Sequence, residues 1–387
     1  MERDIYDEDH EAFRDVVKEF IKRYASDEKR RQWDAAGEID RATMLAAGEA
    51  GIIGLSVPEE FGGAGMLQDY RFRSVVLEET IGAGLGSLAG ALGIQDDLAV
   101  PDIVHMGTQA QKEKWLPGMA TGEILGALAM TEPGAGSDLR GIKTTAKKVD
   151  GGYLVNGAKT FISSGKTADM VVTFVKTGEG NRPDAFSLLI LENGMEGFDH
   201  GKKLEKMGFH GWDTAELSFT DVFVPEENLI SGREGQGFIQ LMMNLPLERL
   251  SIGVAAAAAG EAAFVWTRDY TLSREAFGER IADFQNSRFK LADMATTVDV
   301  MWAYVDRAMM LYKDQKLTAE EAAKVKFWTT DREAELLDIG VQLHGGYGYI
   351  TEYPIARAYL DARVHRIYGG TNEIMRDIVS RQIVGKR

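Results

Sequence analysis

The chain has 387 residues, 44% of them hydrophobic, and carries a formal net charge of −16 at pH 7. This length exceeds what one ordinary hydrophobic core supports, so we expect two or three domains. The acidic balance and the lack of a basic stripe argue against a nucleic-acid-binding protein and against one that binds an anionic membrane surface.

The residue inventory excludes several kinds of chemistry. The sequence contains no cysteine, which removes disulfides, thiolate catalysis and iron–sulfur ligation. Its six histidines are scattered without the spacing of metal ligands, so we predict no metal site. No apolar run approaches the roughly 20 residues of a membrane span, and the acidic start of the chain resembles neither a signal peptide nor a transit peptide. We therefore expect a cytoplasmic protein without a membrane span, whose redox chemistry, if it has any, uses an organic cofactor.

Helical spacing dominates the first third of the chain. Apolar residues recur every three or four positions from Glu11 to Ala25, which predicts an amphipathic helix. Glycines and a proline then predict a loop over residues 46–66. Helices rich in Gly and Ala follow over 75–107, and we expect the chain to leave them at 112–123. We predict a mostly α-helical N-terminal domain over residues 1–124.

The middle of the chain has β character. Short runs rich in Val, Ile, Phe and Thr alternate with turn residues, and we expect strands at 153–156, 160–163, 170–176, 185–191 and 215–224. They predict a β domain, barrel-like or sandwich-like, over 125–237. Helical spacing then returns in four long segments, at 238–270, 285–313, 319–341 and 351–384. The remaining domain, 238–387, is therefore predicted to be a four-helix bundle, and the fold class is α+β.

A glycine-rich stretch, Ala129–Gly141 (AMTEPGAGSDLRG), separates the first helical part from the strands. Its glycines allow the backbone to approach a ligand and to offer N–H groups, as a phosphorylated or flat polar cofactor would need. An ordinary turn-rich loop explains the segment equally well. The glycine spacing matches neither a Rossmann fingerprint nor a P-loop.

Two segments resemble the signatures of one enzyme family. Thr131 and Glu132, followed by Gly136, Ser137 and Asp138, match the first signature of the acyl-CoA dehydrogenase flavoproteins. The second signature is matched by QLHGGYGYITEYPIARAYLD, through Gln342, Gly345, Gly346, Gly348, Glu352, Arg357 and Asp361. Alone, this second segment is typical of a helix end capped by glycines. Two long signatures in the right order identify the chain as a member of the family, whose helical, β and four-helix parts come in the same order.

The resemblance implies an FAD-dependent reaction. Family members remove a proton from the α carbon of an acyl-CoA thioester and pass a hydride from the β carbon to flavin N5, which leaves a trans double bond. The α proton is weakly acidic, so the site needs a desolvated carboxylate base near that carbon. The thioester carbonyl also needs hydrogen-bond donors for the charge that develops on its oxygen.

The position of the base departs from the commonest pattern of the family. Many members carry a glutamate between an Ile-Tyr pair and Gly-Thr, where this sequence has Gly369. The long-chain and isovaleryl types instead carry the carboxylate on an earlier helix in a Leu-Glu-Arg-Leu context, which here contains Glu248. The resemblance therefore implies Glu248 as the catalytic base. A glutamate on a helix is more often exposed to solvent, but the surrounding residues are apolar: Met242, Met243, Leu245, Leu247, Leu250 and Ile252.

Further site residues follow from the resemblance, position by position. The flavin is expected to contact Leu128, Met130, Thr131, Gly136, Ser137, Phe161, Ile162, Ser163, Thr371 and Glu373. The FAD of a neighbouring subunit is expected to contact Arg274, Phe277, Gln285, Gln342 and Gly346. The substrate is expected to contact Ser137, Arg249, Gly369 and Gly370. Without the resemblance, Phe161 is typical of a core aromatic residue and Arg249 of a cation on a helix surface.

The C-terminal sequence is most similar to the long-chain type of the family, which implies an acyl-CoA substrate, a homotetramer and an electron-transfer flavoprotein as electron acceptor. Three alternatives stay open. The same fold is found in acyl-CoA oxidases and in flavin monooxygenases, although a monooxygenase has no need of a proton-abstracting glutamate. The third alternative is a non-catalytic acyl-CoA-binding subunit. Neither the length nor the branching of the acyl chain can be read from these motifs.

Overall fold

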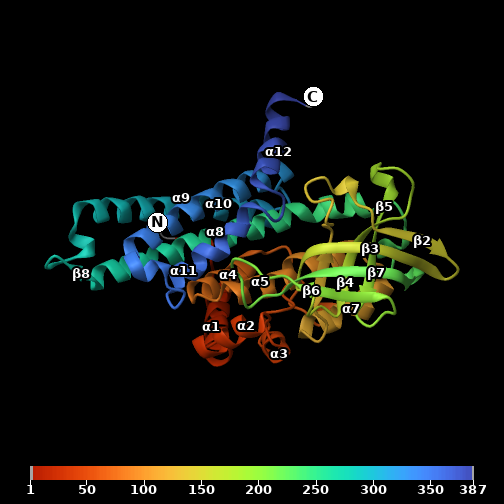
Figure 1. The fold of residues 1–387 in the computed structure, drawn as a ribbon, viewed down its shortest axis with the longest axis horizontal. Helices are drawn as coiled ribbons and strands as arrows, with labels where there is room; N and C mark the ends of the chain where they lie inside the picture. Colours follow the sequence, from red (N-terminus) through yellow and green to blue (C-terminus); the bar gives the residue numbers. More distant parts are fainter. Residues whose placement is uncertain (1–2, 386–387) are drawn as a thin grey trace.

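Helices make up the first part of the chain in the computed structural model, which describes residues 3–385 (Figure 1). Several of them have a polar N-cap residue. The Asp7 side chain accepts a hydrogen bond from the backbone N–H of His10, and the Thr108 side chain accepts one from the backbone N–H of Gln111. A π turn, Ile94–Ala99, joins α5 to α6 without a break. The helices are α1 (Glu8–Tyr24), α2 (Asp27–Ala36), α3 (Arg41–Glu49), α4 (Arg71–Gly82), α5 (Gly86–Gly93), α6 (Val100–Met106) and α7 (Gln109–Thr121).

Helix α7 corrects one expectation. Residues 112–123 were expected to be the exit from the preceding helices, yet most of them are helical although they contain Pro117 and two glycines. The face that carries Trp115, Leu116 and Met119 is buried in the core. Burial of this face therefore outweighs the weak helix propensity of the segment.

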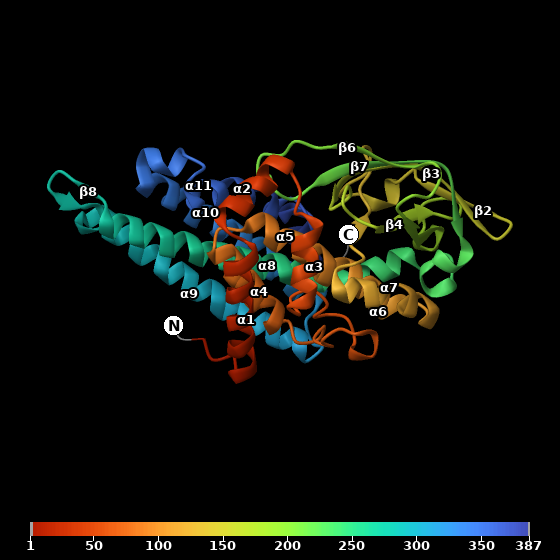
Figure 2. The same cartoon turned by 90° about the horizontal axis from the view of Figure 1, so that it is seen from below.

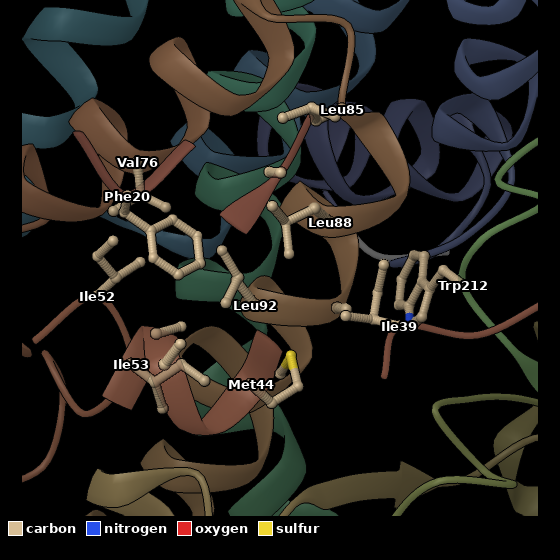
Figure 3. Packing of buried hydrophobic residues seen from close by; sticks show 14 of the residues in the cluster. Phe20, Ile39, Met44, Ile52, Ile53, Val76, Leu85, Leu88, Leu92 and Trp212 are labelled. Atoms are coloured by element: carbon tan, nitrogen blue, oxygen red, sulfur yellow. The ribbon is translucent and has the colours of Figure 1, made fainter. Parts of the chain in front are cut away.

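The N-terminal helices share a core with side chains from the middle part of the chain, among them Phe209 and Trp212. Figure 3 shows Trp212 beside Ile39, at the edge of a cluster that also contains Leu88 and Leu92. The Trp212 indole N–H donates to Ser164 Oγ at 2.9 Å, so the buried ring keeps a polar partner. The packing of Trp212 into this cluster holds the first helical part against the middle part of the chain.

The middle part is a seven-stranded sheet with the strand order β1-β4-β2-β3-β7-β6, and β5 pairs with β4. Strands β1 and β4 run parallel, whereas β3 and β7 run antiparallel over most of their length. The strands are β1 (Gly126–Ala129), β2 (Thr145–Val149), β3 (Gly152–Ser163), β4 (Met170–Lys176), β5 (Phe186–Glu192), β6 (Phe198–Lys203) and β7 (Thr214–Pro225).

Three strands were not predicted from the sequence patterns. β1 is four residues long and lies within the apolar run ILGALAM at 124–130, while β2 and β6 consist largely of polar or charged residues. The two runs expected at 153–156 and 160–163 form one strand, β3, because its ladder with β7 continues across the register shifts between them. The expected strands at 170–176, 185–191 and 215–224 match β4, β5 and β7 closely.

The C-terminal part consists of helices, with a short hairpin after the first. α8 (Gly237–Ser273), α9 (Gln285–Lys313) and α10 (Ala319–His344) lie side by side, and the hairpin strands β8 (Glu275–Ala276) and β9 (Glu279–Arg280) form one tip of the molecule (Figures 1 and 2). α8 is long and apolar enough by composition to cross a membrane, but 67% of its most apolar window is buried in the protein, as in a core helix.

The prediction of a fourth long helix over 351–384 is wrong. The chain there forms α11 (Pro354–Ala362), a 3₁₀ turn at Arg363–Arg366, and α12 (Asn372–Val384). Between the last two, Gly369 and Gly370 have φ of +63° and +90°, a left-handed conformation that no α-helix can include. The turn that interrupts the helix is the same Ile-Tyr-Gly-Gly-Thr segment that the family resemblance singles out.

Close packing of α8 on α10 holds the first half of α8 in place. A Cβ on Gly253 would lie 2.6 Å from Val325 Cγ1, and neighbouring Ala256 and Ala257 are fully buried. Small residues therefore let the two helix backbones approach each other. Because Gly253 lies just over one turn beyond Glu248, this contact also positions the proposed base.

We predict that Gly253→Val lowers the free energy of unfolding by about 2 kcal/mol, because overpacking a tight helix contact costs about 1–3 kcal/mol. Gly82→Val is the matched control, since a Cβ at this exposed end of α4 meets no atom within 4 Å, and it should change stability by no more than about 0.5 kcal/mol. Denaturant midpoints measure both. Equal shifts for the two variants would contradict the packing argument.

Candidate active site

Glu248 lines a cavity between three parts of the chain. α8 supplies Leu241, Asn244, Leu245 and Glu248; the helix from α5 to α6 and the strand end at β1 supply Asp97, Leu98, Asp102, Leu128 and Met130. The carboxylate is half-buried, so it is not the solvated helix glutamate of the alternative interpretation. Two residues predicted to contact the flavin, Leu128 and Met130, therefore share a cavity with the predicted base.

The turn at Gly369 passes directly beside this carboxylate. A Cβ built on Gly369 would lie 3.5 Å from Glu248 Oε1 and 2.4 Å from Ile252 Cδ1. The two positions at which the family carries its carboxylate thus lie next to each other in this chain. A larger side chain at 369 would compete with the Glu248 carboxylate for the same space.

Two buried cations flank the turn. Arg249 Nε lies 3.5 Å from the Gly369 carbonyl oxygen, and Lys326 Nζ donates to the Gly370 carbonyl oxygen at 2.9 Å and to Asn372 Oδ1 at 2.9 Å. Burial, followed by the nearby Arg249 charge, lowers the pKa of Lys326 to about 8. Burial raises the pKa of Glu248, and the charges of Arg249 and Lys326 oppose that rise. The site therefore holds a desolvated carboxylate close to two positive groups.

Glu132, in the first signature, shapes the loop instead of facing a ligand. Its buried carboxylate accepts the backbone N–H groups of Lys143 and Thr144 at 2.6 and 2.9 Å. It also accepts from Lys159 Nζ at 2.9 Å, and the same ammonium group donates to the Met130 carbonyl oxygen. This network fixes the backbone at Met130 and leaves Thr131 half-buried and Gly136 and Ser137 exposed.

A strand irregularity turns Phe161 outward. The β3–β7 register shifts between Lys159 and Ile162, and Phe161 between them has a φ of +59°. Such irregularities re-aim side chains beside functional sites, and here 67% of the Phe161 side chain is exposed. Ser163 is half-buried nearby in sequence, whereas the Ile162 side chain is only 2% exposed within the sheet core. The interpretation of Phe161 as core packing is therefore wrong, and Ile162 can offer a ligand only its backbone.

A second group of predicted contacts lies at the far end of the molecule. The β8–β9 hairpin and the sheet occupy opposite ends in Figures 1 and 2. Arg274 follows the end of α8, roughly 40 Å along the helix axis from Glu248 at 1.5 Å per residue. Its guanidinium lies 5.9 Å from the Tyr347 ring centroid. One chain does not bring this group to the Glu248 cavity; its members, all exposed, are Arg274, Phe277, Gln285, Gln342 and Gly346.

The start of α12 contains the remaining two predicted contacts. Thr371 is the N-cap of this helix, and its side chain accepts the Ile374 backbone N–H at 3.3 Å. Glu373 is exposed in the first turn. Thr371 follows Gly370 directly and Glu373 is three positions after it, so the Gly369–Gly370 turn links both to the Glu248 cavity.

Sequence reasoning missed several cavity residues. Asp97, Asp102, Leu241 and Asn244 line the cavity, and Lys326 braces the turn beside it. The available signal was the acidic positions inside an otherwise apolar helical stretch, GIQDDLAVPDIVHM. Conversely, two of the apolar neighbours expected around Glu248 face outward, because Met242 is 37% and Met243 61% exposed.

Comparison with known proteins assigns the chain to a family. The N-terminal, middle and C-terminal domains of acyl-CoA dehydrogenase match residues 7–123, 127–222 and 235–384. The chain belongs to the acyl-CoA dehydrogenase family. It is 41% identical over 384 residues to the mitochondrial long-chain specific acyl-CoA dehydrogenase of Mus musculus, which covers 99% of this chain and 88% of the mouse protein.

Solved acyl-CoA dehydrogenase structures share the fold. The enzyme from Geobacillus kaustophilus superposes with a TM-score of 0.94 at 42% identity, covering 98% of this chain and 99% of the other. The Bacillus anthracis acyl-CoA dehydrogenase, solved in complex with FAD, superposes with a TM-score of 0.90 at 32% identity, covering 98% of this chain and 67% of the other. These relatives confirm the predicted family and α+β fold class, and with them an oxidoreductase.

We predict that Gly369→Ala lowers the free energy of unfolding of this acyl-CoA dehydrogenase by about 1–2 kcal/mol, the cost of a left-handed conformation for a residue with a Cβ. The added Cβ also meets Ile252. Gly134→Ala is the control, because a Cβ there meets nothing within 4 Å and its φ is not left-handed. Denaturant unfolding without cofactor compares the two, and an equal cost would contradict the crowding at Gly369.

Proposed function

We propose that this chain binds FAD and oxidises an acyl-CoA thioester to its trans-2-enoyl product, with Glu248 removing the α proton. The observation that carries the proposal is the shared cavity of the Glu248 carboxylate, Leu128 and Met130. Gly369 supports it, because the absence of a side chain there leaves space beside the carboxylate. Similarity to the mouse enzyme favours a substrate of the long-chain type.

Burial gives Glu248 the properties that proton abstraction needs. A carboxylate out of bulk water is a stronger base, and its pKa is raised for the same reason. Arg249 and Lys326 oppose that rise, because their positive charges favour the anionic form of the carboxyl group. We assign the backbone of Gly369 and Gly370, which borders the carboxylate, to the thioester side of the site, where donors are needed for the developing oxyanion.

Residues of the cavity and of the neighbouring strand β3, whose Thr160 N–H donates to the Thr131 carbonyl oxygen, fit a planar, partly polar cofactor. Phe161 offers an exposed aromatic face, Thr131 and Ser163 offer hydroxyls, and Leu128 and Met130 border Glu248 with apolar groups. When bound, FAD supplies the acceptor for the hydride of the β carbon. The FAD complex of the Bacillus anthracis relative supports the same cofactor here.

A second copy of the chain would complete this site. Arg274, Phe277 and Gln285 lie at the end of the molecule opposite the sheet, so they reach a cavity like that of Glu248 only in another subunit. We therefore propose a homotetramer in which these residues contact the FAD of a neighbour. We further propose that the enzyme is cytoplasmic and passes its electrons to an electron-transfer flavoprotein; peroxide formation in place of that transfer would favour an oxidase.

We predict that Glu248→Gln retains FAD and binds acyl-CoA but reduces flavin bleaching by at least about a thousandfold, the scale seen when an essential catalytic group is removed. Anaerobic titration with saturated acyl-CoAs of different lengths, followed by flavin absorbance, measures the loss. Glu19→Gln, on the exposed face of α1, is the matched control and should bleach at the wild-type rate. Unchanged bleaching by Glu248→Gln would require another base.

We predict that kcat/KM falls as the pH decreases, because a protonated Glu248 cannot act as a base. The midpoint of this fall should lie above the ordinary glutamate pKa of 4.5, because burial raises the pKa of Glu248. Lys326→Met should move the midpoint further up, since it removes a charge that favours the carboxylate. Lys326→Arg keeps the charge and should move it less. A downward shift in Lys326→Met would contradict this electrostatic assignment.

A further inference from the structure

Asp102 is a buried carboxyl group in the Glu248 cavity that the mechanism does not use. Its side chain is 1% exposed and lines the cavity together with Glu248. Oδ1 accepts a hydrogen bond from Asn244 Nδ2, whereas Oδ2 has no hydrogen-bond partner within residues 3–385. A buried polar atom without a partner is rare and needs an explanation.

The orientation of Asp102 is fixed from both neighbouring helices. Asn244 Oδ1 lies 2.8 Å from His105 Nδ1, so the amide of Asn244 is held by His105 while its nitrogen donates to Asp102. Asp102 and His105 are one turn apart on α6, and Asn244 and Glu248 are one turn apart on α8. The network therefore satisfies one oxygen of Asp102, a residue that lines the cavity, and leaves the other oxygen buried without a partner.

The other buried acid in this wall is already paired. Asp97 accepts from Arg73 at 3.1 Å and from Tyr70 at 3.2 Å. Asp102 has no such cation; burial raises its pKa to about 7, Asn244 opposes the rise, and the Glu248 charge adds to it. Both of its protonation states are thus accessible near neutral pH.

We propose that Asp102 Oδ2 hydrogen-bonds a hydroxyl group on the acyl chain, so that the cavity selects a hydroxylated acyl-CoA over the unsubstituted chain of the same length. This inference rests on the proposed dehydrogenase function. A hydroxyl both donates and accepts, so it matches either protonation state of Asp102. An acyl carboxylate would be repelled by Glu248, and an ammonium group would lose its hydration among Leu98, Leu241 and Leu245.

The test uses the FAD-loaded enzyme and saturated acyl-CoAs of one length that carry a hydroxyl at successive carbons beyond C3, with the unsubstituted chain as reference. We expect one hydroxylated isomer to exceed the reference in kcat/KM by about 10- to 100-fold, the range of a hydrogen bond to an ionisable group. Asp102→Leu should remove that preference mainly through KM, and the isosteric Asp102→Asn should reduce it. Asp96→Asn is the control, because Asp96 is buried but faces the Gly54 and Ser56 backbone, and the preference should persist.

A binding measurement separates recognition from catalysis. In the Glu248→Gln background, the Kd of the preferred isomer, followed by the flavin spectrum, should be lower than that of the reference, and Asp102→Leu should equalise the two. If the reference chain bleaches the flavin but no hydroxylated isomer is preferred, the Asp102 inference is wrong and the dehydrogenase proposal stands. If no acyl-CoA bleaches it, the dehydrogenase proposal itself fails. An equal loss with both substrates and a shifted pH midpoint would show that Asp102 acts only through Glu248.

Discussion

The space beside the Glu248 carboxylate is the constraint on which the rest of the site depends. Gly369 borders that space in a left-handed conformation, and a Cβ there would lie 3.5 Å from Oε1 and far too close to Ile252. The same turn stops the chain from continuing one helix into α12. A single residue without a side chain thus determines both the space beside the Glu248 carboxylate and the course of the C-terminal backbone.

The buried cations belong to the same arrangement. Lys326 holds the turn through the Gly370 carbonyl and Asn372, and Arg249 lies against the Gly369 carbonyl. Burying these charges is costly, so they persist only where backbone carbonyls and a carboxylate compensate them. Glu248 lies on α8 and Lys326 on α10. The close contact between Gly253 and Val325 keeps these two helices together. Helix packing therefore keeps the Glu248 carboxyl group and the Lys326 ammonium group at one site.

Much of the fold followed from the sequence because its signals are local. The periodicity of α8, α9 and α10 and the β-branched runs of β4, β5 and β7 predicted those elements closely. α7 was missed because tertiary burial of Trp115 outweighed its proline and glycines. Glu248 and Gly369 could be paired through the family pattern, whereas Asp102 and Lys326 come from other elements and join the site only through folding. Only tertiary contacts show which partners a buried charge has.

Two carboxyl groups can share one small cavity because their surroundings differ. Glu248 lies near Arg249 and Lys326, which favour its anion, while no cation opposes the rise of the Asp102 pKa to about 7. The nearby cations therefore favour the anionic form of Glu248, whereas burial and the Glu248 charge favour the protonated form of Asp102. This difference in surroundings suits the base role that we propose for Glu248 and the hydrogen-bonding role that we propose for Asp102. A neutral Asp102 does not repel the Glu248 carboxylate, so the cavity can hold a base and a polar recognition group without a second buried ion pair.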